Sequence, residues 1–289
     1  MRLFTWKQRD TSRTKKQETG GRKAMRLKKV FAKSQRSVFI PYITCGDPSL
    51  EKTEELISII ESAGADIIEL GVPFSDPIAD GPIIQAAYNR ALKQGVNLEK
   101  VIKMVERQRK RVKIPIILLS YYNPIYKYGI ERFVSSSKDS GVSAVVIPDL
   151  PPEEAREIMA HSEKKDFSII FLLAPTSTDE RIKFIGSQSA PFIYYVSITG
   201  ITGIRDSLSF HLKERLQKIK ALCKKPVAVG FGISNKYQAE EVAKIADGVI
   251  VGSAIVDIIG KNLVSPVKPV FDFVSSIASC VHKVKKICV

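Results

Sequence analysis

The chain has 289 residues, of which 44% are hydrophobic and 26% are charged, and its formal net charge is +15. This composition is typical of a folded globular protein and excludes a disordered or fibrous one. No apolar run reaches the roughly 18–20 residues of a membrane-spanning helix. No hydrophobic core of a signal peptide follows the first residues, so we expect a cytoplasmic protein that does not bind membranes.

The first 24 residues differ in composition from the rest. Residues 1–24 hold eight Lys/Arg and two Asp/Glu, so +6 of the +15 lies there. Because this stretch cannot bury much apolar surface, we predict a disordered extension over 1–24, with Met25 as an alternative start and 25–289 as the folded domain. A basic arm for an anionic partner is the alternative. The other basic residues are spread over helix-like segments, which argues against nucleic-acid binding.

Eight short apolar runs follow, separated by segments with apolar residues at helical spacing. Continuously apolar strands indicate a parallel sheet that helices cover, and eight such units predict a single (β/α)8 TIM barrel in the α/β class. A doubly wound open sheet is the alternative, but no G-x-G-x-x-G follows the first strand. The predicted strands are Val38–Thr44, Ile67–Leu70, Ile114–Tyr121, Ala144–Pro148, Ser168–Leu173, Phe192–Ser197, Val227–Gly230 and Gly248–Val251.

A glutamate, Glu69, interrupts the second predicted strand. Active sites of (β/α)8 barrels lie at the carboxyl ends of the strands and in the loops that follow. If Glu69 faces the barrel interior, the loss of water raises its pKa toward neutrality, which makes it a candidate general acid and base. The structural alternative is a glutamate that pairs with a buried lysine or arginine.

A second carboxylate, Asp80, follows eleven residues later in a loop that glycines and prolines constrain. This loop is long enough to fold over the mouth of the barrel and to place Asp80 opposite Glu69. Two carboxyls in different environments let one site hold both a proton donor and a charged acceptor. A turn-stabilising role is the alternative for Asp80, and Asp76 is interpreted as a turn or loop-packing residue.

Three glycine-containing turns follow the last three predicted strands: Gly200-Ile-Thr-Gly203, Gly230-Phe-Gly232-Ile-Ser234 and Gly252-Ser253-Ala254. Glycine lets backbone N–H groups approach a phosphate, and a helix after the eighth strand would direct its positive end at the anion. The last two strands carry the usual phosphate site of this fold. We therefore expect a small phosphorylated substrate, although each turn alone could be mere turn geometry.

These motifs resemble tryptophan synthase α subunits. The stretch Ile68–Gly81 matches that family's signature position by position, and the likeness extends from about Met25 to Asn262, through Val38–Pro48 and the three glycine turns. The resemblance implies a (β/α)8 barrel that cleaves indole-3-glycerol phosphate by a retro-aldol reaction. The products are indole and glyceraldehyde 3-phosphate.

The resemblance also assigns roles. Glu69 would place a proton on indole C3 and remove one from the glycerol hydroxyl, and Asp80 would bind the indole N–H and stabilise the positive intermediate. The phosphate would be held by Gly203, Gly232, Gly252 and Ser253. Tyr42, Thr44, Leu119, Tyr121 and Tyr194 would line the pocket, although each could be ordinary barrel packing.

A partner is implied as well. In this family the loop with Gly200 and Thr202 closes on the loop with Asp76 and Asp80, and indole passes through a tunnel to a β subunit in an α2β2 assembly. Pyridoxal phosphate is expected only on that partner, and no cofactor here. Ile198 stands where many relatives carry arginine, which questions loop closure and intersubunit signalling but not the chemistry.

Two alternatives stay open. One is another phosphate-binding barrel enzyme, such as an epimerase with metal-ligating histidines, but His161, His211 and His282 all fall in helix-like stretches, so no metal is expected. The other is a non-catalytic α-like subunit that only activates a β partner. Such a subunit would be expected to lose Glu69, Asp80 or a glycine turn.

Overall fold

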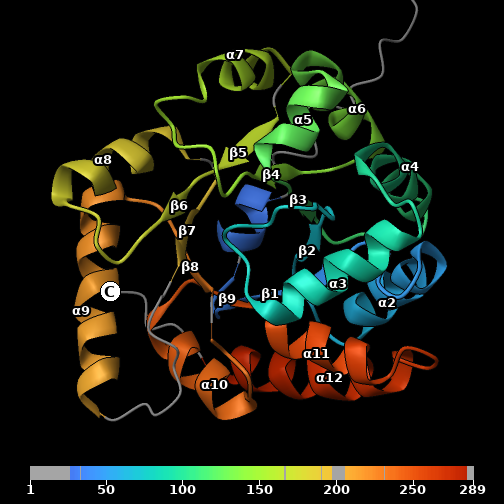
Figure 1. Cartoon of the computed structure of the whole chain (residues 1–289). Coiled ribbons are helices and arrows are strands. Elements are labelled where there is room, and N and C mark those ends of the chain that lie inside the picture. The colour runs from blue at the N-terminus through green and yellow to red at the C-terminus, as the bar shows by residue number, and fades with distance from the viewer. Residues whose placement is uncertain are drawn as a thin grey trace, which may run out of the picture.

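The protein is described by a computed structural model over residues 27–32, 34–165, 167–189, 191–196, 206–230 and 232–284, with the backbone alone for 206–210. Its strands lie inside a ring of helices (Figure 1), and neighbouring strands of the described residues pair in parallel, in the order β5-β4-β3-β2-β1-β9-β8-β7-β6. The strands are β1 Val38–Thr44, β2 Ile68–Gly71, β3 Ile116–Leu119, β4 Ala144–Val146, β5 Ser168–Ile170, β6 Leu172–Leu173, β7 Ile193–Val196, β8 Val227–Gly230 and β9 Gly248–Val251.

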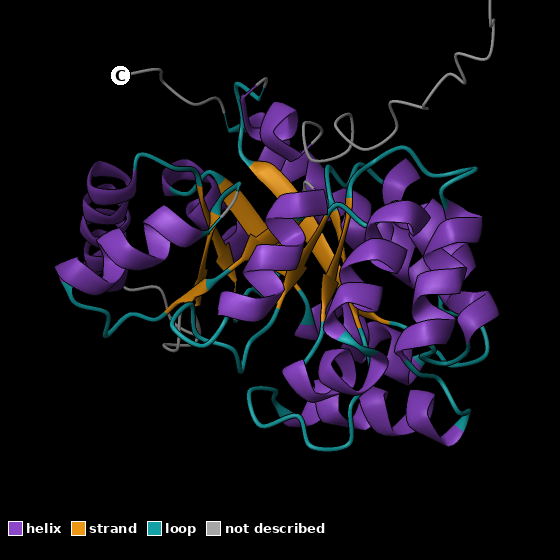
Figure 2. Ribbon diagram, turned by 90° about the horizontal axis from the view of Figure 1, so that it is seen from above, coloured by secondary structure: helices purple, strands orange, loops and turns teal. Residues whose placement is uncertain are grey.

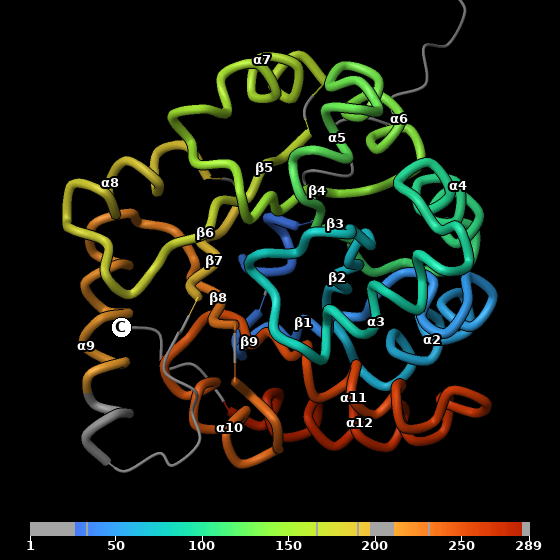
Figure 3. The backbone as a smooth tube through the Cα atoms, in the orientation of Figure 1, coloured from blue at the N-terminus to red at the C-terminus, as the bar shows by residue number. Residues whose placement is uncertain are grey.

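The chain runs once round the ring, so that α12 lies against α2 and α11 (Figure 3). Within the described residues no helix is long and apolar enough to cross a bilayer. The helices are α2 Leu50–Ser62, α3 Pro82–Lys93, α4 Leu98–Gln108, α5 Tyr122–Tyr128, α6 Ile130–Ser140, α7 Arg156–Lys165, α8 Asp179–Gln188, α9 Asp206–Cys223, α10 Lys236–Ile245, α11 Ser253–Lys261 and α12 Val267–Lys283.

The nine strands correspond to the eight predicted ones. Ser168–Leu173, predicted as one strand, is divided at Phe171 into β5, which pairs with β4, and β6, which pairs with β7. The ring of strands is therefore continuous except at this single residue. The prediction of a (β/α)8 barrel is confirmed.

Helices surround the strands (Figure 2). Side chains along each strand alternate between the barrel interior and these helices. In β1, Val38 and Ile40 belong to the interior cluster, whereas Phe39 and Ile43 pack in the outer cluster with the helices. All seven residues of β1 are buried. Burial on both faces explains the continuous apolar runs, and each fully buried Val, Ile, Leu or Phe contributes about 1.5–3 kcal/mol.

A short helix at 27–32 closes the amino end of the barrel. Leu27 is fully buried in the interior cluster, and the ring of Phe31 lies 4.9 Å from that of Phe192. These apolar contacts fill the barrel from the amino ends of the strands. The carboxyl ends remain for a functional site, as is usual in this fold.

Candidate active site

Glu69 lies inside the barrel. Ile68 and Leu70 pack outward in the outer cluster, so the intervening Glu69 faces inward, between Tyr42 on β1 and Ile117 on β3. Its relative exposure is 0%. The strand period of two thus places one carboxyl in an otherwise apolar interior.

The electrostatic environment of Glu69 favours the protonated carboxyl. Burial is the largest influence and raises the pKa of Glu69 to about 8, although a hydrogen bond from Tyr194 opposes the shift. The Tyr194 hydroxyl donates to Oε2 at 3.4 Å, and Oε1 has no hydrogen-bond partner among the described residues. Among the described residues, no lysine or arginine bonds to Glu69. The alternative of a buried ion pair therefore does not hold for these residues.

Asp80 lies in the loop between β2 and α3, above the barrel mouth. The Tyr121 hydroxyl donates to Asp80 Oδ2 at 2.6 Å and accepts from the Ala79 N–H at 2.9 Å. Gln85 Nε2 donates to the Asp80 carbonyl at 2.8 Å. Burial raises the pKa of Asp80, and the bond from Tyr121 opposes this rise. Tyr121 therefore fixes both the loop and the direction of the carboxylate.

Asp76, in the same loop, accepts a hydrogen bond of 2.5 Å from the Ser75 hydroxyl, and its carbonyl accepts from the Ile78 N–H at 2.9 Å. These are the contacts of a turn. They agree with the interpretation of Asp76 as a turn residue.

A group of hydroxyls supports the mouth of the barrel. Tyr42 Oη donates to Tyr88 Oη at 3.2 Å and lies 3.3 Å from Thr44 Oγ1. Tyr88, on α3, is fully buried and was not among the predicted site residues. A signal for it exists, because Ile84, Tyr88 and Ala91 recur at helical spacing on the buried face of α3.

Two glycines make room for the tyrosines. A Cβ on Gly71, two residues after Glu69, would lie 2.0 Å from Tyr42 Oη, and one on Gly230 would lie 2.9 Å from Tyr194 Cε1. Any larger residue would therefore displace the rings. The glycines at the ends of β2 and β8 let aromatic side chains cross the barrel mouth beside Glu69.

A cavity of about 370 Å³ opens at this end of the barrel. Its volume is in the range of small-molecule sites. Glu69 is not on its wall, but Tyr194, which bonds to Glu69, is. Thr44 and Tyr121 lie behind the wall and bond to Tyr42 and Asp80. The wall consists of Tyr42, Asp80, Gly81, Ile83, Ile84, Leu119, Tyr194, Gly232, Ile233, Ser234, Ile250, Gly252, Ser253, Ala254, Asp257, Ile258 and Phe273.

Backbone groups that suit an anion line the side of the cavity at β8 and β9. Gly232 has φ 75°, a left-handed conformation that favours glycine. Gly252 is the N-cap of α11, and Ser253 and Ala254 begin its first turn. The first N–H groups of a helix lack intrahelical acceptors and carry the positive end of its dipole. The structure thus brings two of the three predicted glycine turns together.

The remaining predicted turn contains Gly200, Thr202 and Gly203. This turn and the neighbouring Ile198 lie outside the described residues. So do residues 1–24. His161, His211 and His282 lie on α7, α9 and α12, as the sequence predicted.

The closed parallel barrel, the inward carboxyl and the cavity at the carboxyl ends of the strands define a (β/α)8 barrel protein with its ligand site where enzymes of this fold carry theirs. Comparison with known proteins specifies the family. A family model described as tryptophan synthase alpha chain matches residues 28–283. This chain belongs to the tryptophan synthase alpha chain family, as its motifs predicted.

Individual relatives agree. The chain is 51% identical over 226 residues to the tryptophan synthase alpha chain of Geotalea daltonii. These residues make up 78% of this chain and 86% of the relative. It is 51% identical over 224 residues to the tryptophan synthase alpha chain of Microcystis aeruginosa, and the match covers 77% of this chain and 85% of that relative. The crystal structure of tryptophan synthase subunit alpha from Legionella pneumophila superposes with a TM-score of 0.83 at 36% identity, covering 89% of this chain and 98% of that one.

Proposed function

We propose that this chain is a carbon–carbon lyase that cleaves indole-3-glycerol phosphate to indole and glyceraldehyde 3-phosphate in tryptophan biosynthesis. The single observation that supports this most is Glu69. It is a fully buried carboxyl beside a cavity of substrate size, and burial raises its pKa to about 8. Because this pKa lies near neutrality, the group can both give and accept a proton.

Glu69 would act twice. Its protonated carboxyl gives a proton to indole C3, and the resulting carboxylate accepts the proton of the glycerol hydroxyl as the bond between indole C3 and the glycerol carbon breaks. The electrons of that bond restore the aromatic indole, and the hydroxyl becomes the aldehyde. One proton is given and one is taken, so Glu69 returns to its starting state. Tyr194, which donates to Oε2, would orient the carboxyl.

Asp80 would stabilise the intermediate. Protonation at C3 places positive charge on the indole nitrogen, and a carboxylate that accepts the N–H bond stabilises that charge in a cavity with little water. The bond from the Tyr121 hydroxyl holds Asp80 in place for this role. Tyr42, Leu119 and Tyr194 on the wall would contact the indole, with Thr44 and Tyr121 behind them.

The phosphate would bind at the other side of the cavity, on the backbone of Gly232, Gly252 and Ser253 and on the Ser253 hydroxyl. The start of α11 and the left-handed Gly232 support this placement. Gly203 would add a further N–H from the loop after β7, and that loop, with Gly200 and Thr202, would close on the loop of Asp76.

We further propose that the chain works with a tryptophan synthase β subunit in an α2β2 heterotetramer, to which indole passes directly. The chain would need no cofactor itself, and pyridoxal phosphate would belong to the partner. Ile78, 84% exposed beside Asp80, supports a contact surface at this mouth. With Ile198 where many relatives carry arginine, we expect the β subunit to accelerate cleavage less than in those relatives.

The test measures indole released from indole-3-glycerol phosphate by the full chain, with and without a β subunit. We expect Glu69→Gln to lower the rate by about 10²–10⁴-fold while the fold remains. The matched control is Glu131→Gln on α6, which is exposed and should retain full activity. Wild-type protein that releases no indole but still activates the β subunit would replace this proposal by a non-catalytic regulatory subunit.

A further inference from the structure

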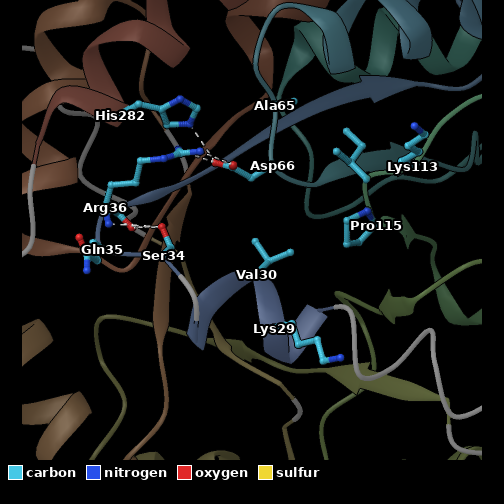
Figure 4. A pocket seen from close by; sticks show the side chains of 11 residues that line it. Lys29, Val30, Ser34, Gln35, Arg36, Ala65, Asp66, Lys113, Pro115 and His282 are labelled. Carbon is cyan, nitrogen blue, oxygen red and sulfur yellow. Dashed lines mark hydrogen bonds and ion pairs between the residues drawn. The ribbon is translucent and has the colours of Figure 1, made fainter.

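A second cavity, of about 900 Å³, lies at the amino end of the barrel, and the candidate active site lies at the carboxyl end. Figure 4 shows the side chains that line this second cavity. Its walls come from the helix at 27–32, the segments that precede β1, β2 and β3, and α12. The volume is within the range of small-molecule sites. The lining residues are Lys29, Val30, Ser34, Gln35, Arg36, Ala65, Asp66, Lys113, Ile114, Pro115 and His282.

The one carboxylate among these lining residues, Asp66, is already neutralised. Arg36 donates to both its oxygens, at 3.0 and 2.8 Å, and the Phe39 N–H donates to Oδ2 at 2.9 Å. His282 Nε2 lies 2.9 Å from the same Oδ2. Asp66 therefore has its own partners and does not attract a cationic ligand.

Two ammonium groups on the wall are available. Lys29 and Lys113 are exposed, and neither side chain has a hydrogen-bond or ion-pair partner among the described residues. Only the backbone N–H of Lys113 is used, in a bond of 2.7 Å to Glu61 Oε1. With three cations, Lys29, Arg36 and Lys113, against the single Asp66, the wall carries two net positive charges without counting His282.

Apart from the polar Ser34 and Gln35, the remaining wall is apolar. Val30, Ala65, Ile114 and Pro115 line it, and Figure 4 shows Val30 between Lys29 and the Arg36–Asp66 pair. Lys29 and Lys113 place positive charge at two separate points of the wall (Figure 4), and lysine binds phosphate as a point charge. The apolar surface matches a ring or short hydrocarbon. We propose that this cavity binds a small phosphate monoester with an apolar body, at a site separate from the substrate site.

The test uses phenyl phosphate and the three histidines of the full chain, labelled with ¹³C in the ring. His282 lies on the cavity wall, whereas His161 and His211 lie on α7 and α9, so one assigned signal reports on this cavity even if the probe also enters the active site. The assignment comes from His282→Gln. We expect the His282 signal alone to shift in a saturable manner at constant pH, and inorganic phosphate to bind more weakly because it lacks the apolar body.

The double variant Lys29→Gln/Lys113→Gln should weaken this binding about tenfold, the effect of roughly 1.4 kcal/mol. The matched control is Lys28→Gln/Lys110→Gln, which removes the same charge from the same two segments outside the cavity. It should change affinity less than twofold, and both double variants should release indole at the wild-type rate. An unmoved His282 signal, equal weakening by both double variants, or equal affinity for inorganic phosphate would overturn the proposal.

Discussion

Asp66 and Glu69 stand three residues apart at the two ends of one short stretch, and their environments shift the pKa in opposite directions. Burial raises the pKa of Glu69 to about 8, because only Tyr194 offsets the loss of water. Burial would also raise the pKa of Asp66, but the bonds from His282, Arg36 and the Phe39 N–H outweigh it and lower the pKa. The difference follows from partners, not from depth alone.

The two ends of the barrel therefore use carboxyls differently. At the amino end a paired carboxylate joins α12 to the start of β1 and stabilises the fold. At the carboxyl end Glu69 has no cationic partner among the described residues, which costs stability but leaves a proton that can be transferred. Asp47, near the carboxyl end of β1, shows that a paired carboxylate can occur at that end too, because Arg90 holds both its oxygens at 2.6 and 2.7 Å.

The largest effect should come from breaking the pair of Arg90 with Asp47. Arg90→Met leaves the Asp47 carboxylate, whose side chain is 0% exposed, without its cation, and should lower the free energy of unfolding by about 3–5 kcal/mol. Chemical denaturation at pH 7 measures it, with the exposed Arg111→Met as control. A loss below about 1 kcal/mol would show that pairing does not matter at this end.

Asp80→Asn should reduce kcat for indole release by about 10²–10³-fold, because the amide cannot supply the negative charge that stabilises the intermediate. The KM should change little, since the phosphate contacts remain. The exposed Asp139→Asn is the control for a lost carboxylate elsewhere. A rise in KM of the same size, with kcat unchanged, would assign Asp80 to substrate binding alone.

The raised pKa of Glu69 predicts that the free energy of unfolding depends on pH. Its pKa in the folded protein, about 8, exceeds the usual value near 4.3. The contribution of Glu69 to the free energy of unfolding is therefore fully present below about pH 4.3 and is lost as the pH rises through about 8. From pH 5.5 to 8, wild type should therefore lose about 3 kcal/mol relative to Glu69→Gln. Parallel unfolding curves across this range would contradict the raised pKa.

The smallest effect should appear at the amino end, with the opposite sign. The pKa of Asp66 is lowered in the folded protein. Its contribution to the free energy of unfolding is therefore present above the pKa of the unfolded chain and is lost as the pH falls through the pKa of the folded protein. Asp66→Asn should cost about 1–2 kcal/mol at pH 7 and progressively less below about pH 4, while kcat stays unchanged. Thermal unfolding at several pH values measures this, and a cost that persists undiminished in acid would indicate lost packing instead.

The fold could be predicted because its signal is local. Three strands have their predicted bounds, β1, β8 and β9, since each is a continuous apolar run that turn residues delimit. The division of the fifth strand at Phe171 could not be foreseen. It depends on how the neighbours β4 and β7 pair, which the local pattern does not contain.

The sequence by itself determined the barrel, the position of Glu69 on the second strand and the neighbouring ends of the last two strands, because apolar pattern and chain order fix the strands and which of their ends meet. Only the tertiary structure decided that Tyr121 holds Asp80, that Tyr88 supports Tyr42, and that His282 meets Asp66 across 216 positions. Such contacts depend on the distances between side chains of different elements. A periodic pattern specifies which residues share a face but not their partners, and burial and partners together set the pKa.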